Sequence, residues 1–415
     1  MVISQKKNLL VKSKLMKKIY VIILLFCIGI VVLSDSFGAK AQGTWTQKSN
    51  FGGTARMFSV GFSIGNKGYL GTGSDGAYTQ DFWEWDQSTD TWTQKANFGG
   101  ASRFAAIGFS IGTKGYIGVG WNITTKYQDF WEWDQASNIW TQKANFGGTG
   151  RLVATGFSIG TKGYIGTGYD GAYVQDFWEW DQATDTWTQK ASFTGVGRQA
   201  SNSFSIGTKG YIGIGSDATA AYLPDFWEWD QSTDTWTQKA NFLGTARYEA
   251  VGFSIGTNGY IGTGQDGNGP KQDFWEWNQA TNIWTQKANF SGIARQSAVG
   301  FSVGTKGYIG TGRNGGTMQR DFWEYEQNAT GIDELSQITT SIFPNPFSDQ
   351  TIFSLSNQVT NASLLIYNLF GKKVKNINFS GEKVVVESED ISSGTYFYQI
   401  LSEEKNIASG KLIVQ

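Results

Sequence analysis

Histidine is absent from this chain of 415 residues, and cysteine occurs only once, as Cys27. Imidazole and thiolate groups are the usual protein ligands of zinc, copper and haem iron, so the composition excludes such metal sites. A serine nucleophile with a histidine base is excluded for the same reason. Cys27 lies in an N-terminal segment that we expect to be removed. The mature chain therefore has no disulfide and depends on its hydrophobic core for stability.

Clusters of basic residues are also missing from the part of the chain that we expect to persist. The whole sequence has 34 basic and 35 acidic residues, a formal net charge of −1. Removing residues 1–41 takes away seven lysines and one aspartate, which leaves 27 basic and 34 acidic groups. A mildly acidic chain without basic patches argues against nucleic acid as a partner.

The N-terminus has the order of features found in secretory signal peptides. A basic stretch with Lys12, Lys14, Lys17 and Lys18 precedes an apolar run from Ile19 to Leu33, and a small-x-small sequence follows and ends at Ala41. This order predicts cleavage after Ala41 and entry into an extracytoplasmic compartment. The alternative is a membrane anchor, but fifteen apolar residues are short for a span. We expect no membrane-spanning segment after the signal peptide is removed.

A repeat dominates the rest of the chain. The tetrad Trp-Thr-Gln-Lys recurs six times at intervals of 47 to 49 residues, beginning at Trp45 and ending at Trp284. Repeats of this length indicate a propeller or a solenoid. Aromatic and β-branched residues between glycine-rich turns predict four antiparallel strands in each unit. In the first unit the predicted strands are Met57–Ile64, Tyr69–Gly73, Asp81–Asp86 and Thr91–Lys95.

The order of the repeats predicts a closed ring. The last unit ends near Glu326 without its own tetrad, whereas the first tetrad, at Trp45, precedes any complete unit. The N-terminal strand is therefore expected to complete the sixth blade. An all-β, six-bladed propeller over residues 42–332 follows, since closure leaves no long exposed sheet edges.

Each unit resembles the kelch repeat. The resemblance depends on an arginine, a first strand, a strand of the type aliphatic-Tyr-aliphatic-Gly-x-Gly, an acidic-aromatic strand and a tryptophan. It departs from the family where paired glycines are usual, because Gly71 and Gly73 are separated by a threonine. The resemblance implies a partner-binding rim of loops. The copper site of galactose-oxidase-like relatives needs histidine, which this chain lacks.

A different pattern begins after a polar linker at residues 333–341. Alternating runs predict a small antiparallel sandwich (Ig-like) over residues 342–415. The successive motifs at Phe343–Phe347, Leu364–Asn368, Phe370–Val374, Ser393–Phe397 and Gly410–Val414 together resemble the type A sorting domain of the type IX secretion system. That resemblance implies a bacterium of the Bacteroidota, contact with the secretion machinery, removal of the domain on export, and a secreted or cell-surface location.

Strand parity predicts which loops share a rim. The loop between the second and third strands should emerge beside the link from the fourth strand to the next blade, since both follow an even number of passes. Each of these links ends in an arginine. The six are Arg56, Arg103, Arg151, Arg198, Arg247 and Arg295.

Two interpretations of these arginines compete. Guanidinium groups around the channel mouth would suit carboxylate or sulfate ligands. Alternatively, each arginine pairs with a nearby acid such as Asp81 or Glu84 and stabilises the blade. Repetition in all six units favours the structural interpretation, although single arginines could serve both purposes.

Aromatic residues are the other candidates for ligand contact. Seventeen of the 18 tryptophans belong to the repeated strands and are expected to form the core, while Trp121 alone lies in a rim loop. Amphipathic aromatics are frequent at contact sites. The remaining candidates are the variable tyrosines of the rim and one deviant carboxylate beside a rim arginine: Tyr78, Tyr127, Tyr169, Tyr173, Tyr222, Tyr248 and Glu249.

Catalysis and metal binding are weaker predictions. The repeated glutamates, such as Glu84, lie in the middle of strands and should be paired. We expect no cofactor; calcium bound by loops such as Asp75–Asp81 is an alternative with incomplete ligand spacing. The composition and pattern favour a non-enzymatic recognition or adhesion module for a protein or glycan. A carbohydrate-active enzyme using Arg, Tyr and Glu, with Glu249 as the residue to test, and a spacer without a ligand remain alternatives.

Overall fold

The computed structural model describes residues 43–327, 340–402 and 405–415. The predicted signal peptide at residues 1–41 lies outside this range, as does most of the predicted linker at residues 333–341. The chain divides into two compact units, Met1–Asn328 and Ala329–Gln415. The described residues form strands and turns, and no helix among them could cross a membrane.

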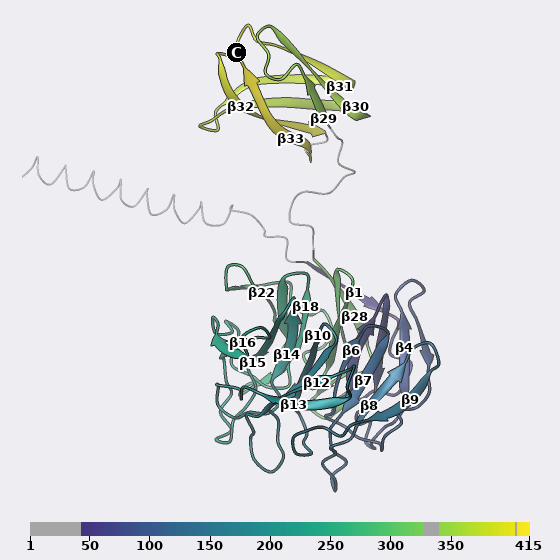
Figure 1. Ribbon diagram of the computed structural model, residues 1–415. Helices are drawn as coiled ribbons and strands as arrows, with labels where there is room; N and C mark the ends of the chain where they lie inside the picture. Colours follow the sequence, from purple (N-terminus) through teal and green to yellow (C-terminus); the bar gives the residue numbers. More distant parts are fainter. Residues whose placement is uncertain (1–42, 328–339, 403–404) are drawn as a thin grey trace, which may run out of the picture. The chain divides into compact units, whose positions relative to one another are not determined.

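Six four-stranded antiparallel sheets form the first unit, and Figure 1 shows them arranged as a propeller. Blades one to three contain β2 (Val60–Ile64), β3 (Lys67–Gly71), β4 (Phe82–Asp86) and β5 (Thr91–Gln94); β6 (Ile107–Ile111), β7 (Lys114–Gly118), β8 (Phe130–Asp134) and β9 (Ile139–Lys143); and β10 (Thr155–Ile159), β11 (Lys162–Gly166), β12 (Phe177–Asp181) and β13 (Thr186–Lys190). Blades four and five contain β14 (Asn202–Ile206), β15 (Lys209–Gly213), β16 (Phe226–Asp230) and β17 (Thr235–Gln238); and β18 (Val251–Ile255), β19 (Asn258–Gly262), β22 (Phe274–Asn278) and β23 (Ile283–Gln286). Blade six contains β24 (Val299–Val303), β25 (Lys306–Gly310), β28 (Phe322–Glu326) and β1 (Thr44–Lys48).

Two short hairpins decorate the loops of the last two blades. They are β20 (Gln265–Asp266) with β21 (Gly269–Pro270), and β26 (Arg313–Asn314) with β27 (Thr317–Met318). Both belong to the segment between the second and third strands of their blade.

The first strand of each blade alternates buried and half-buried residues, as in β2, where Val60, Phe62 and Ile64 are buried. Gly61 lies so close to the neighbouring blade that an added Cβ would come within 2.3 Å of Val299. The glycine therefore permits close approach of the innermost strands. The predicted strand began at Met57, but β2 begins at Val60 because Phe58 has a left-handed backbone, with φ of 54°.

Aromatic side chains in edge-to-face contact join neighbouring blades. The ring of Phe82 in blade one lies 5.1 Å from Trp133 and 5.1 Å from Trp140 of blade two, both in edge-to-face geometry. Trp133 is completely buried, as are the equivalent tryptophans of four other blades. Edge-to-face pairs of this kind contribute about 0.5–1.5 kcal/mol beyond their area. These five tryptophans and Trp284 therefore form blade-to-blade core, as the sequence predicts, whereas the other repeated tryptophans are half-buried.

The N-terminal strand closes the ring, as the repeat order predicts. Strand β1 pairs antiparallel with β28, and Trp45 lies opposite Tyr325. The indole of Trp45 also packs 5.0 Å from Phe274 and 5.1 Å from Phe290 of the fifth blade. Blade six is thus completed by residues that precede their partners in β28 by 274 to 282 positions in the chain.

A second closure surrounds the central axis. One residue of each blade donates its backbone N–H to the carbonyl oxygen of its counterpart in the preceding blade, at 2.9–3.2 Å. All six have a left-handed backbone, with φ between 47° and 55°. These axial ring residues are Phe58, Ala105, Val153, Ala200, Glu249 and Ser297.

The second unit is a single five-stranded antiparallel sheet. Its strands are β29 (Thr340–Phe343), β30 (Gln350–Asn368), β31 (Lys373–Glu387), β32 (Gly394–Ser402) and β33 (Lys405–Val414). Register shifts between Ser354 and Ala362 interrupt the pairing of β30 with β31, and such bulges bend a strand. The sheet encloses its own core, which includes Phe353, Leu364 and Ile400.

Candidate functional site

The loops predicted to share a rim do meet in each blade. A β-bridge joins the interblade link to the loop between the second and third strands, for example Met57 to Ser74 and Phe104 to Trp121. The six axial ring residues begin their inner strands from this same rim. Most of the sequence differences between blades are therefore collected at one end of the channel.

The conserved position at the end of each link is occupied by a buried arginine. Arg151 donates from both terminal nitrogens to Asp176, at 2.6 and 2.7 Å. Its Nη1 and Nε also donate to the carbonyl oxygens of Thr167 and Thr149, each at 3.0 Å. The guanidinium lies 4.8 Å from the ring of Phe146, and the side chain is 0% exposed. All the donor directions of this guanidinium are thus directed into the protein.

The other five arginines repeat this arrangement. They pair with the aspartate that opens the third strand of the same blade: Arg56–Asp81, Arg103–Asp129, Arg198–Asp225, Arg247–Asp273 and Arg295–Asp321. Burial raises the pKa of Asp81, but the hydrogen bond and charge of Arg56 outweigh this effect and hold the pKa below its usual value. The geometry matches the interpretation in which each arginine ties the link to the loop.

The repeated glutamates are also paired within their blades. Glu84 accepts hydrogen bonds from Lys67 and from the hydroxyl of Tyr69, both at 2.7 Å. The Tyr69 hydroxyl in turn accepts from Gln135 of the next blade, at 2.7 Å. These bonds explain why the pKa of Glu84 is lowered although burial acts to raise it. This carboxylate lies within the blade stack, away from the rim.

A chain of aromatic rings runs from the axial ring across blades one and two. Phe58 lies 5.7 Å from Phe104, which stacks on Tyr78 at 5.3 Å and contacts Trp121 at 5.5 Å. All four side chains are half-buried. We call these four residues the aromatic strip. Two of them, Tyr78 and Trp121, are candidates from the sequence.

The other rim tyrosines have different environments. Tyr222 and Tyr248 stack at 5.2 Å, and Tyr169 meets Tyr173 edge-to-face at 5.3 Å. Tyr127 covers the guanidinium of Arg103 at 3.9 Å, so its ring packs within the rim. The structure therefore places Tyr78 and Trp121 against the same ring, that of Phe104, and pairs Tyr222 with Tyr248 and Tyr169 with Tyr173, in three separate groups.

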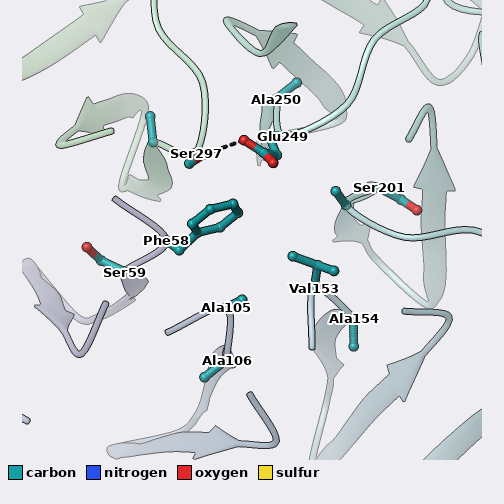
Figure 2. Close-up of a pocket in the computed structure, with 12 residues that line it drawn as sticks. Phe58, Ser59, Ala105, Ala106, Val153, Ala154, Ser201, Glu249, Ala250 and Ser297 are labelled. Atoms are coloured by element: carbon teal, nitrogen blue, oxygen red, sulfur yellow. Dashed lines mark hydrogen bonds between the residues drawn. The ribbon is translucent and has the colours of Figure 1, made fainter. Parts of the chain in front are cut away.

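The axial ring residues line a pocket of about 160 Å³ at the channel mouth. Figure 2 shows the ring of Phe58 beside the central space, with Val153 on the other side and Glu249 near Ser297. Alanines contribute most of the remaining lining, and Glu249 is the one carboxylate in it.

Glu249 is held on one oxygen only. Its Oε2 accepts from the hydroxyl of Ser297 and from the side-chain amide of Gln296, the latter at 2.8 Å. Burial raises the pKa of Glu249 above its ordinary value, and the charge of Arg313 opposes this shift. Burial and the nearby Glu249 likewise raise the pKa of Tyr248. The sequence singled out Glu249 as a deviant acid, and the structure places it in the pocket.

The loops considered for calcium have internal partners for their acids. Asp75 accepts from Thr54 at 2.7 Å, and Asp266 pairs with Lys271 at 2.8 Å. Among the described residues, no group of three or more acidic side chains could hold a metal ion. Calcium binding stays an untested prediction.

Sequence reasoning did not identify Phe58 and Phe104. A signal was available, because the position of Phe58 reads Phe, Ala, Val, Ala, Glu and Ser, and the position of Phe104 reads Met, Phe, Leu, Gln, Tyr and Gln, in six otherwise similar units. Variation at one position of a near-identical repeat indicates that the fold does not fix the side chain at that position.

Two comparisons with known proteins agree with the fold. Residues 341–415 match the secretion system C-terminal sorting domain family. The solved structure titled "Structure of YjhT" is similar with a TM-score of 0.58 and 16% identity, over 66% of this chain and 96% of that chain. No curated protein sequence matches significantly. The chain thus consists of a propeller with a type IX secretion sorting domain at its C-terminus, which implies a secreted or cell-surface location.

Proposed function

We propose that the propeller is a kelch-type recognition or adhesion module that binds a protein or glycan through its variable rim. The observation that carries this proposal is the gathering of the aromatic strip and the axial pocket at one end of the channel. Aromatic side chains supply large contact area at low entropic cost, which suits them to recognition. The propeller fold alone supports no particular ligand.

A carbohydrate-active enzyme is the second candidate, and Glu249 is its supporting observation. Burial raises the pKa of Glu249, and this direction favours the protonated form that a general acid requires. Hydrolysis of a glycoside generally uses a pair of carboxyl groups, whereas the lining of the described pocket contains one. For this reason we favour binding without turnover.

Binding by the exported chain to arrayed glycans and to purified surface proteins tests the proposal. Trp121→Ala should reduce affinity for a bound ligand, because it removes the outer ring of the aromatic strip. Ile123→Ala is the matched control, since Ile123 lies in the same loop and is 64% exposed. Equal affinity of both variants and the parent chain would refute the rim as the binding surface. Chemical conversion of a bound sugar would favour the enzyme.

A further inference from the structure

The channel mouth has two chemically different sides. Blades one and two contribute the aromatic strip, which reaches the axis at Phe58. Blades five and six contribute Glu249, Gln296 and Ser297, and the charge of Arg313 acts on Glu249. Pockets that hold small ligands usually combine an apolar wall with a few well-placed polar groups.

The second carboxylate oxygen of Glu249 is available to a ligand. Both hydrogen bonds to this side chain end on Oε2, and within the described residues no donor lies within hydrogen-bond distance of Oε1. Glu249 is half-buried and lines the pocket, and Oε1 is not among the fully buried side-chain oxygens without a partner, so a ligand can reach it from the pocket. A ligand hydroxyl can therefore replace solvent at Oε1 and donate a hydrogen bond to it.

We propose that the axial pocket binds the terminal sugar residue of an oligosaccharide, whose ring packs on Phe58 and donates a hydroxyl to Oε1 of Glu249. The following residues of the oligosaccharide lie along the aromatic strip toward Trp121. This inference depends on the proposed function, because it names the ligand class of the same rim. It also gives the orientation of the bound oligosaccharide, whose terminal residue lies at the axis.

The dimensions and charge of the pocket match one neutral ring. Its volume of about 160 Å³ is below the range of about 300–1,000 Å³ typical of sites that enclose a whole drug-sized ligand. The positive charge of Arg313 beside Glu249 makes a cationic ligand less favourable than a neutral polyol. A sugar ring has apolar faces for Phe58 and hydroxyl donors at its edge for Glu249.

Calorimetric titration of the full chain with gluco-, galacto- and N-acetylgluco-configured saccharides, from monosaccharide to tetrasaccharide, tests this assignment. Glu249→Ala should weaken binding of every active saccharide by about tenfold or more, because the oxygen that accepts the ligand hydroxyl is lost. The variant should fold, since Ala105 and Ala200 occupy the equivalent position with the same backbone conformation. Phe58→Ala should likewise weaken all of them.

Trp121→Ala should reduce the affinity of the tetrasaccharide but leave that of the monosaccharide unchanged. Glu326→Ala is the control, since Glu326 is 56% exposed at the opposite end of its blade. Full affinity of both Glu249→Ala and Phe58→Ala for saccharides, with loss in Trp121→Ala, would overturn the pocket while leaving the recognition proposal intact. Binding of a protein but of no saccharide would refute the proposal that the pocket binds an oligosaccharide. Rim variants that alter no binding at all would refute the proposed function as well.

Discussion

The substitution Arg151→Ala distinguishes a structural arginine from a ligand-binding one. It removes a side chain that is 0% exposed and leaves Asp176, 23% exposed, without its bidentate partner. Breaking a buried ion pair by deleting one partner costs about 3–5 kcal/mol of stability. Because Asp176 is partly solvated, the expected loss of unfolding free energy is about 3 kcal/mol. A loss of this size corresponds to a decrease in Tm of about 6–12 °C in a domain of about 150–250 residues, and to the lower end of that range in a larger propeller.

The assay is thermal unfolding followed by circular dichroism, with ligand binding measured below the transition. Lys190→Ala is the control, because Lys190 lies 3.7 Å from the partly exposed Asp234 and such surface pairs contribute about 1 kcal/mol or less. If Arg151→Ala unfolds at the temperature of the parent chain but no longer binds ligand, the arginine contacts the ligand and the structural reasoning is refuted.

Three further predictions concern the core, the pocket and the closure of the ring. Asn202→Val should raise the free energy of unfolding by about 1–3 kcal/mol in chemical denaturation, because both polar side-chain atoms of Asn202 are buried without a partner in the described structure. Blade one has a buried valine, Val60, at the equivalent position. Glu249→Gln should flatten the profile of Tm against pH. Because the pKa of Glu249 is raised in the folded state, the stability that this carboxyl group contributes falls as the pH rises from its unfolded pKa to its folded pKa. A variant whose Tm changes with pH as steeply as that of the parent chain would contradict this. Deleting residues 44–48 should make blade six the first site of limited proteolysis, since β28 would lose its outer partner and become an exposed edge next to β25. Protection equal to that of the parent chain would show that β1 is dispensable.

The architecture could be predicted because the same strand pattern is repeated in the sequence of each blade. The tetrad at Trp45 and the missing tetrad after Glu326 together predicted a strand pairing that the structure confirms. Repetition made this possible, since an error in one unit is corrected by five others. The motifs after the linker likewise predicted a sorting domain, and a family match over residues 341–415 agrees.

The site could be predicted only in part, because its residues act through backbone geometry that composition does not reveal. The apolar run that contains Phe58 suggested a continuous strand, yet the left-handed backbone at this residue separates it from β2 and directs it to the axis. The arginines gave the opposite difficulty. Their side chains suit a ligand as well as an aspartate, and only the placement of Asp176 beside Arg151 distinguishes the two.

The pairing of β1 with β28 has a consequence for biosynthesis. A ribosome makes Thr44–Lys48 before any other described strand of the propeller and Phe322–Glu326 after all the rest, yet the two are neighbours in one sheet. The circle cannot be sealed until nearly the whole repeat region has been translated. The nascent polypeptide is therefore kept from reaching its final topology until synthesis of the propeller is almost complete.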